Sequence, residues 1–246
     1  MLQDIWTVFW RDWVVLRRRL GRYILSRMVS PVLYLVAFGW GLGRGMQVMQ
    51  GNYLDFIVPG IVALNSMTIS FNSVGSPLNM SRLYHKTLEE YLIAPISSLS
   101  IVIGKVLSGA LRGLISSGIM LILAYAFGSH IQMSLWFLVA LLLNCLVFAA
   151  MAVVAAMTMG THEEMANFNT YVLLPMSFLC ATFFLPDHLP VILRYFIELL
   201  PLTHASYALR ALAAGAAVPF ASLAVMSVYA VIFVLAGVRL MEKVRE

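Results

Sequence analysis

The polar residues that could do chemistry in this chain form two groups. One is the charged stretch 81–98, which carries Glu89 and Glu90 and lies between two long hydrophobic runs. The other is a row of small polar residues at steps of three or four: Asn65, Thr68, Asn72, Ser76 and Asn79. A dense charged element between hydrophobic runs favours contact with a partner in the aqueous phase. Uncharged polar side chains in an apolar helix favour hydrogen bonds.

Neither group is a catalytic site. The sequence contains no His-x-x-x-His pair and no paired aspartates within a hydrophobic run, and we find no nucleophile with a matching base. The phosphate-binding pattern that ends in Gly-Lys-Ser/Thr is absent as well. We therefore expect no catalytic residue, metal site or cofactor in this chain, and any chemical energy that its function requires must come from a partner.

The composition makes the lipid bilayer the solvent for most of the chain. Of the 246 residues, 61% are hydrophobic and 11% are charged, whereas globular domains carry about 25% charged residues. A transmembrane helix needs about 20 apolar residues. Six bands meet this requirement and predict an all-α integral membrane protein whose single transmembrane domain covers residues 1–246: 23–43, 56–79, 103–127, 134–158, 168–185 and 219–240.

The basic residues are distributed unevenly between the two sides that six spans would define. Thirteen Lys and Arg fall on one side, and Arg44, Arg194 and Arg210 fall on the other. Cytoplasmic loops carry the excess of positive charge. We therefore expect both termini in the cytoplasm. The net charge of +5 indicates topology rather than nucleic-acid binding.

Residues 1–22 are expected to form an amphipathic helix before the first span. Apolar residues recur at helical spacing around Asp12, and three arginines follow at 17–19. This pattern predicts a helix in the cytoplasmic interface, either as an anchor alone or also as a contact for a cytoplasmic subunit. On the band 103–127, we expect Lys105 to reach the headgroups and Arg112 to point inward or find a partner.

The polar row on the band 56–79 shares one helical face. One interpretation is hydrogen bonding between helices, which holds a membrane bundle together. The other interpretation is a lining for a substrate path. Both interpretations can hold together if the polar row faces an interface between two subunits and this interface opens.

We expect residues 82–95 to form a short amphipathic helix with one packing face and one acidic face. The packing residues would be Leu88, Tyr91 and Leu92. Glu89 and Glu90 would meet a partner. Pro95 would end the helix, because the residue before a proline avoids the helical conformation. The alternative is an ordinary solvated loop.

Residues 186–216 are apolar but too interrupted to span a membrane. The helix-breaking residues are Pro186, Pro190, Pro201 and Pro219. We expect a pair of short helices that dip back from the outer face, with Arg194 and Glu198 as an i, i+4 pair.

The order and spacing of four segments resemble the membrane subunit of type-2 ABC exporters, the group of drug, polysaccharide and lipo-oligosaccharide permeases. The segments are 56–60, 88–95, 174–178 and 199–203, and the resemblance covers nearly the whole chain. It implies six spans, an interfacial N-terminal helix, a coupling helix at 82–95 and a re-entrant helical segment before the last span.

The resemblance also implies the partners. In such exporters two membrane subunits, here expected to be a homodimer, pair with two ATP-binding subunits that hold ATP and magnesium. The coupling helices dock on those subunits, and Glu89 and Glu90 match the acidic pair of the family. The implied function is export of an amphiphilic substrate, such as a lipid-linked glycan, a lipid or a drug-like molecule, across a bacterial or archaeal cytoplasmic membrane.

Two other function classes stay open as alternatives. A secondary transporter would need intramembrane acids to couple ions, and none of the six bands contains Asp or Glu. An integral membrane enzyme would need the site chemistry that the sequence lacks. The direction of transport follows from the resemblance alone.

Overall fold

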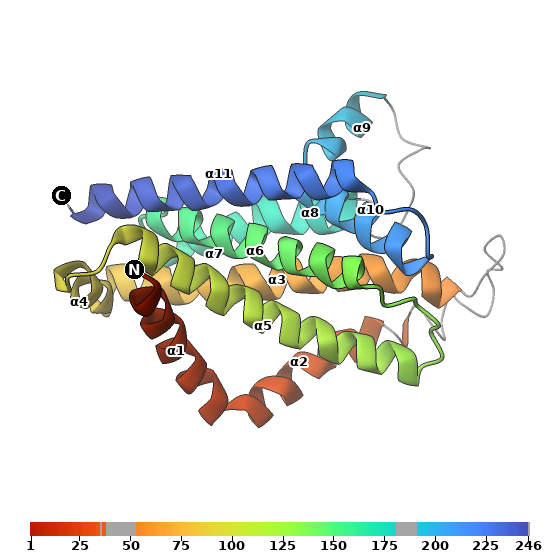
Figure 1. Ribbon diagram of the computed structural model, residues 1–246, viewed down its shortest axis with the longest axis horizontal. Helices are drawn as coiled ribbons and strands as arrows, with labels where there is room; N and C mark the ends of the chain where they lie inside the picture. The colour runs from red at the N-terminus through yellow and green to blue at the C-terminus, as the bar shows by residue number, and fades with distance from the viewer. Residues whose placement is uncertain (35, 38–52, 181–190, 246) are drawn as a thin grey trace.

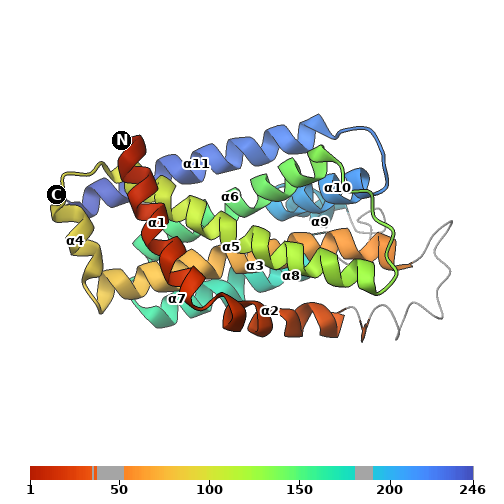
Figure 2. The same cartoon turned by 60° about the horizontal axis from the view of Figure 1, so that its bottom comes forward.

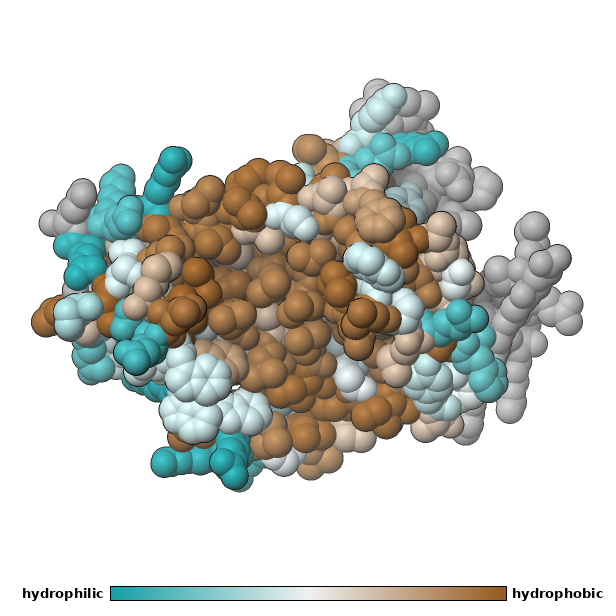
Figure 3. All heavy atoms as spheres, viewed as in Figure 1, coloured by the Kyte–Doolittle hydropathy of each residue, from teal (hydrophilic) through white to brown (hydrophobic). Residues whose placement is uncertain are grey.

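The computed structural model describes residues 1–245 except 35, 38–52 and 181–190, and the described part is helical without any β-strand. Four of its helices are long and apolar enough to cross a membrane: α3 (Tyr53–Leu83), α5 (Ser98–Ala126), α6 (Leu135–Thr158) and α11 (Phe220–Arg245). A broad hydrophobic face covers the bundle between hydrophilic groups at its two ends (Figure 3). This arrangement is that of a multi-pass membrane protein.

Helix α3 is the centre of the bundle. It packs against α5, α6 and α10 (Pro201–Ala213), while α11 packs mainly against α6. Both chain ends lie at the same end of the bundle as the short helix α4 (Thr87–Ile93), and the loop between α5 and α6 lies at the opposite end (Figure 1). The termini and α4 therefore share one end of the bundle.

The N-terminal segment forms two helices that meet at an angle. Helix α1 (Leu2–Arg18) leads away from the bundle, and α2 (Leu20–Tyr34) turns back toward it (Figure 1). Viewed from the side of these two helices, α1 crosses the bundle and α2 runs along its length (Figure 2). Val8 and Leu16 are the buried residues of α1, which packs on α5. The expected first span 23–43 begins inside α2, but its second half lies mostly outside the described residues.

The expected span 168–185 is part of a longer, interrupted helical segment. Helix α7 (His162–Phe168) is followed by the π-helical turn η2 (Asn169–Leu173) and by α8 (Leu174–Leu179). Thr161 Oγ1 accepts a hydrogen bond from Glu164 N at 3.0 Å and thereby caps α7. Residues 181–185 lie outside the described part of the chain, so the count of six spans stays a prediction.

Two short helices precede α11. Helix α9 (Val191–Glu198) and α10 are separated by two residues. The i, i+4 pair predicted on α9 is present, with Arg194 Nε 3.0 Å from Glu198 Oε1. Helix α10 packs into the bundle against α3, α6 and α11. A re-entrant path for residues 186–216 stays a prediction, and residues 186–190 lie outside the described part.

Candidate functional site

Helix α4 lies across the end of the bundle and separates apolar from acidic side chains. It is shorter than the expected helix 82–95, because residues 82–83 still belong to α3 and Lys86 adopts a left-handed conformation with φ 51° between the two helices. Leu88 is buried at 2% exposure, whereas Glu89 and Glu90 are exposed. The side chain of Leu92 lies outside those that the structure describes.

The end of α4 follows the rule for a residue that precedes a proline. Ala94 is extended, with φ −65° and ψ 149°, directly before the exposed Pro95. Ile93, the last residue of the helix, is 85% exposed. Helix α4 therefore presents an acidic and partly apolar outer surface, while its inner side rests on the bundle.

Tyr91 joins α4 to the N-terminal helix. Its hydroxyl accepts a hydrogen bond from Arg11 Nη1, and the Arg11 guanidinium lies 5.0 Å from the centre of the tyrosine ring. The hydrogen bond with Tyr91 raises the pKa of Arg11 above its ordinary value. The Lys105 ammonium lies 5.5 Å from the same ring.

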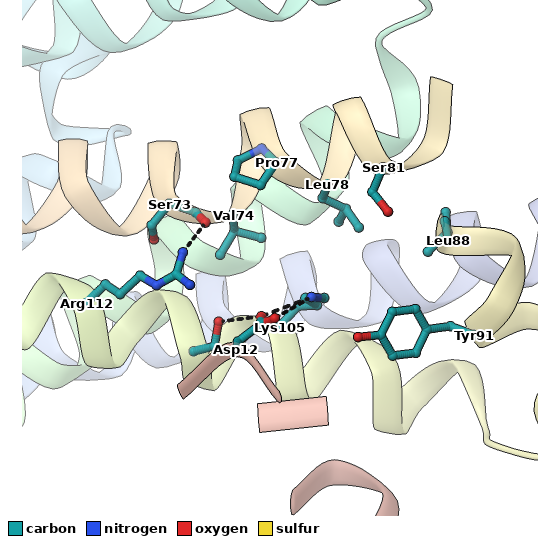
Figure 4. A pocket seen from close by; sticks show the side chains of 11 residues that line it. Asp12, Ser73, Val74, Pro77, Leu78, Ser81, Leu88, Tyr91, Lys105 and Arg112 are labelled. Carbon is teal, nitrogen blue, oxygen red and sulfur yellow. Dashed lines mark hydrogen bonds and ion pairs between the residues drawn. The ribbon is translucent and has the colours of Figure 1, made fainter. Parts of the chain in front are cut away.

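A small polar cavity of about 80 Å³ lies behind Tyr91, between α1, α3, α4 and α5 (Figure 4). On its wall, Lys105 Nζ lies 3.0 and 2.9 Å from the two carboxylate oxygens of Asp12. Ser108 Oγ donates to the same carboxylate at 2.9 Å. The prediction that Lys105 reaches the headgroups is wrong, because this internal carboxylate holds its ammonium.

Arg112 lines the same cavity. Its Nη1 donates to the backbone oxygen of Ser73 at 3.1 Å. The prediction that Arg112 finds an internal partner is thus confirmed, and the partner is a backbone carbonyl of α3. Arg112 therefore fastens α5 to α3 about two helical turns along α5 from Lys105.

The polar row of α3 divides into residues with and without contacts to other helices. Asn65 Nδ2 donates to Ser116 Oγ of α5 at 3.0 Å, and Asn79 Nδ2 donates to the backbone oxygen of Met159 at 3.1 Å. Thr68 bonds back to its own helix at Leu64 O. The remaining two members, Asn72 and Ser76, are half-buried. The row thus includes interhelical hydrogen bonds at both of its ends.

Two polar contacts near this site were not predicted from the sequence. Arg82 Nη1 donates to the backbone oxygens of Ala156, at 2.9 Å, and of Met157, and so binds the carboxyl end of α6. Asn144 of α6 donates to Ser66 Oγ of α3 at 2.7 Å. A single asparagine within the apolar band 134–158 was the only sequence signal for the second contact.

Comparison with known proteins assigns the family. Residues 3–214 match the ABC-2 type transporter family. The chain is 28% identical over 197 residues to the inner membrane transport permease YadH of Escherichia coli (strain K12), which covers 77% of this chain and 76% of that protein. It is 28% identical over 203 residues to nodulation protein J of Bradyrhizobium diazoefficiens, covering 81% of this chain and 77% of the relative. Nodulation protein J of Rhizobium meliloti is 27% identical over 214 residues, with 85% and 81% covered. The resemblance noted in the sequence is therefore confirmed, and the chain belongs to the ABC-2 type transporter family.

Proposed function

We propose that this protein is the membrane subunit of an ATP-driven exporter and that a separate ATP-binding subunit docks on α4. The observation that carries the proposal is the division of α4 between a buried inner side at Leu88 and an exposed acidic side at Glu89 and Glu90. A solvated loop would not need such an anchor. ATP and magnesium would bind to the partner, because this chain lacks a phosphate-binding loop.

The transported molecule would be amphiphilic, and two copies of the chain would form the path. Thr68, Asn72 and Ser76 support this proposal, because they are half-buried on one face of an otherwise apolar helix. Asn65 and Asn79 would support the path indirectly, since their amides hold α3 against its neighbours. The complex would reside in a bacterial or archaeal cytoplasmic membrane with both termini in the cytoplasm.

The docking surface can be tested with a photo-crosslinking amino acid at position 89. We expect crosslinks to a polypeptide that is labelled by azido-ATP in the same membranes. The matched control is the crosslinker at Glu163, because this residue is also an exposed acid in the first turn of a seven-residue helix. If no ATP-labelled polypeptide copurifies with the chain, the proposed function is contradicted.

Charge reversal tests the same surface by function. Glu89→Lys should weaken copurification of the ATP-binding subunit, because like charges would then face it. Glu163→Lys should leave copurification unchanged. Glu89 is the better choice for this test, because the charge of Glu90 also acts on Arg11 within the chain. Equal copurification of the two variants would remove the docking role of the acidic face.

A further inference from the structure

Two adjacent residues of α1 connect α4 with α5. Successive residues of a helix point about 100° apart, so Arg11 and Asp12 reach different neighbours. Arg11 donates to the Tyr91 hydroxyl of α4, while Asp12 binds Lys105 of α5. Helix α1 thus lies between the proposed docking helix and a transmembrane helix.

The contact between Asp12 and Lys105 is well enclosed. The two side chains are 18% and 16% exposed, and Ser108 adds a third hydrogen bond to the carboxylate. Charge-assisted hydrogen bonds are stronger than neutral ones, particularly away from water. These charge-assisted hydrogen bonds therefore hold α1 against α5 at this point.

Tyr91 lies close to both cations of this connection. The Arg11 guanidinium is 5.0 Å and the Lys105 ammonium 5.5 Å from the centre of its ring. Its hydroxyl points toward the Asp12–Lys105 pair (Figure 4). Helix α4 itself packs mainly against α3. Residues 94–97 join it to α5 along the chain, and Tyr91 adds side-chain contacts to α1 and α5.

We propose that Arg11, Asp12 and Lys105 are positioning residues of transport, which carry a displacement of α4 through α1 to α5. This inference rests on the proposed docking of an ATP-binding subunit to α4. If α1 were only an anchor, its ion pair with α5 would matter for assembly alone. With the connection through Tyr91, a push on α4 displaces α1 and α5 together.

The test measures whether ATP binding moves α5 when the ion pair is broken. Spin labels are placed at Tyr84→Cys, in the turn directly before α4, and at Ile122→Cys on α5, which are 60% and 70% exposed. Cys145 and Cys180 are replaced, although both are buried. The distance between the labels is measured in the complex with the ATP-binding subunit, before and after Mg-ATP with vanadate. The variants are Asp12→Lys, Lys105→Asp and the combined swap.

We expect the wild-type complex to change the label distance on addition of Mg-ATP with vanadate. Each single reversal should abolish this change while the ATP-binding subunit still copurifies, and the combined swap should restore it. Arg18→Glu, on the exposed last turn of α1, changes the charge by the same amount and should keep the wild-type response. Asp12→Asn serves as a milder variant if a reversal prevents membrane insertion, and it should reduce the change.

The outcomes separate this inference from the proposed function. A wild-type distance change in Asp12→Lys or Asp12→Asn overturns the role of the ion pair while docking stands. Failure of the swap to restore the change also overturns it. Absence of the ATP-binding subunit from the wild-type preparation contradicts both proposals.

Discussion

The side-chain amide of Asn144 donates to Ser66 Oγ at 2.7 Å and to the backbone oxygen of Ala63 at 3.0 Å, which joins α6 to α3 inside the apolar bundle. Both Asn144 and Ser66 are fully buried. Water cannot replace these hydrogen bonds in such a place, so the pair should contribute to the stability of the bundle.

Replacing Asn144 by Leu should therefore lower the free energy of unfolding by about 0.6–1.7 kcal/mol, the range of interhelical hydrogen bonds in membranes. Thermal or SDS unfolding in detergent would measure the loss. Asn72→Leu is the matched control, because Asn72 is half-buried on the same face as the proposed path. We expect it to leave stability nearly unchanged and to reduce transport. Equal stability of the two variants would contradict a structural role for Asn144.

Gly113 should not tolerate a side chain. A Cβ atom there would lie 2.9 Å from Cys145 Sγ and would also clash with Ser70 Oγ of α3. Gly113→Ala should cost about 1–3 kcal/mol, as overpacking does. Gly118, on the same helix, has open space around it, so Gly118→Ala should gain up to about 1 kcal/mol in helix propensity. Thermal unfolding should show a lower stability for Gly113→Ala and a higher stability for Gly118→Ala. If both variants lost a similar amount of stability, the packing argument would be refuted.

Leu88→Ala should loosen α4 without unfolding the bundle. Removing a buried leucine side chain costs about 2–5 kcal/mol, and here the loss falls on the contact between a seven-residue helix and the bundle. Hydrogen exchange of residues 84–96 should become faster, while exchange in α6 stays slow. Ile93→Ala removes an exposed side chain from the same helix and should leave exchange as it is. Unchanged protection in Leu88→Ala would show that other contacts hold α4.

The orientation in the membrane can be tested by labelling from outside. With Cys145 and Cys180 replaced, a single cysteine at His130 should react with an impermeant thiol reagent in cells with a permeable outer barrier, and one at Lys243 should not. Both native residues are exposed. His130 belongs to the loop between α5 and α6 and Lys243 to the carboxyl end of α11, and these two parts of the chain lie at opposite ends of the bundle (Figure 1). Ser129 is unsuitable for this experiment because it is 1% exposed and donates to Asp55 at 2.7 Å. Labelling at Lys243 alone would invert the proposed topology.

Four of the six expected bands coincide with the long helices α3, α5, α6 and α11, because each of these four is long enough to determine a helix without help from distant residues. The expected span 134–158 and α6 (Leu135–Thr158) differ by a single residue. The amphipathic pattern around Leu88 likewise indicated which side chain would be buried and which acids would be exposed. In these places the local structure is decided by interactions within the segment itself or with the surrounding solvent.

Where a helix ends depended more on its neighbours. The band 56–79 predicts an end at Asn79, but α3 continues to Leu83, because Asn79 and Arg82 bind the backbone at the carboxyl end of α6. The start of α7 at His162, by contrast, depends on local contacts, since Thr161 caps the helix and Glu164 accepts from the backbone of Gly160 at 2.7 Å.

The sequence by itself determined that this is a helical membrane protein of the ABC-2 type, with a short charged helix between two long apolar ones. Only the tertiary structure decided what surrounds that helix. Asp12 and Lys105 are separated by 93 residues, so no periodicity or spacing relates them. Each has charged residues nearer in sequence, and packing of α1 on α5 selects this pair because it excludes water around both charges.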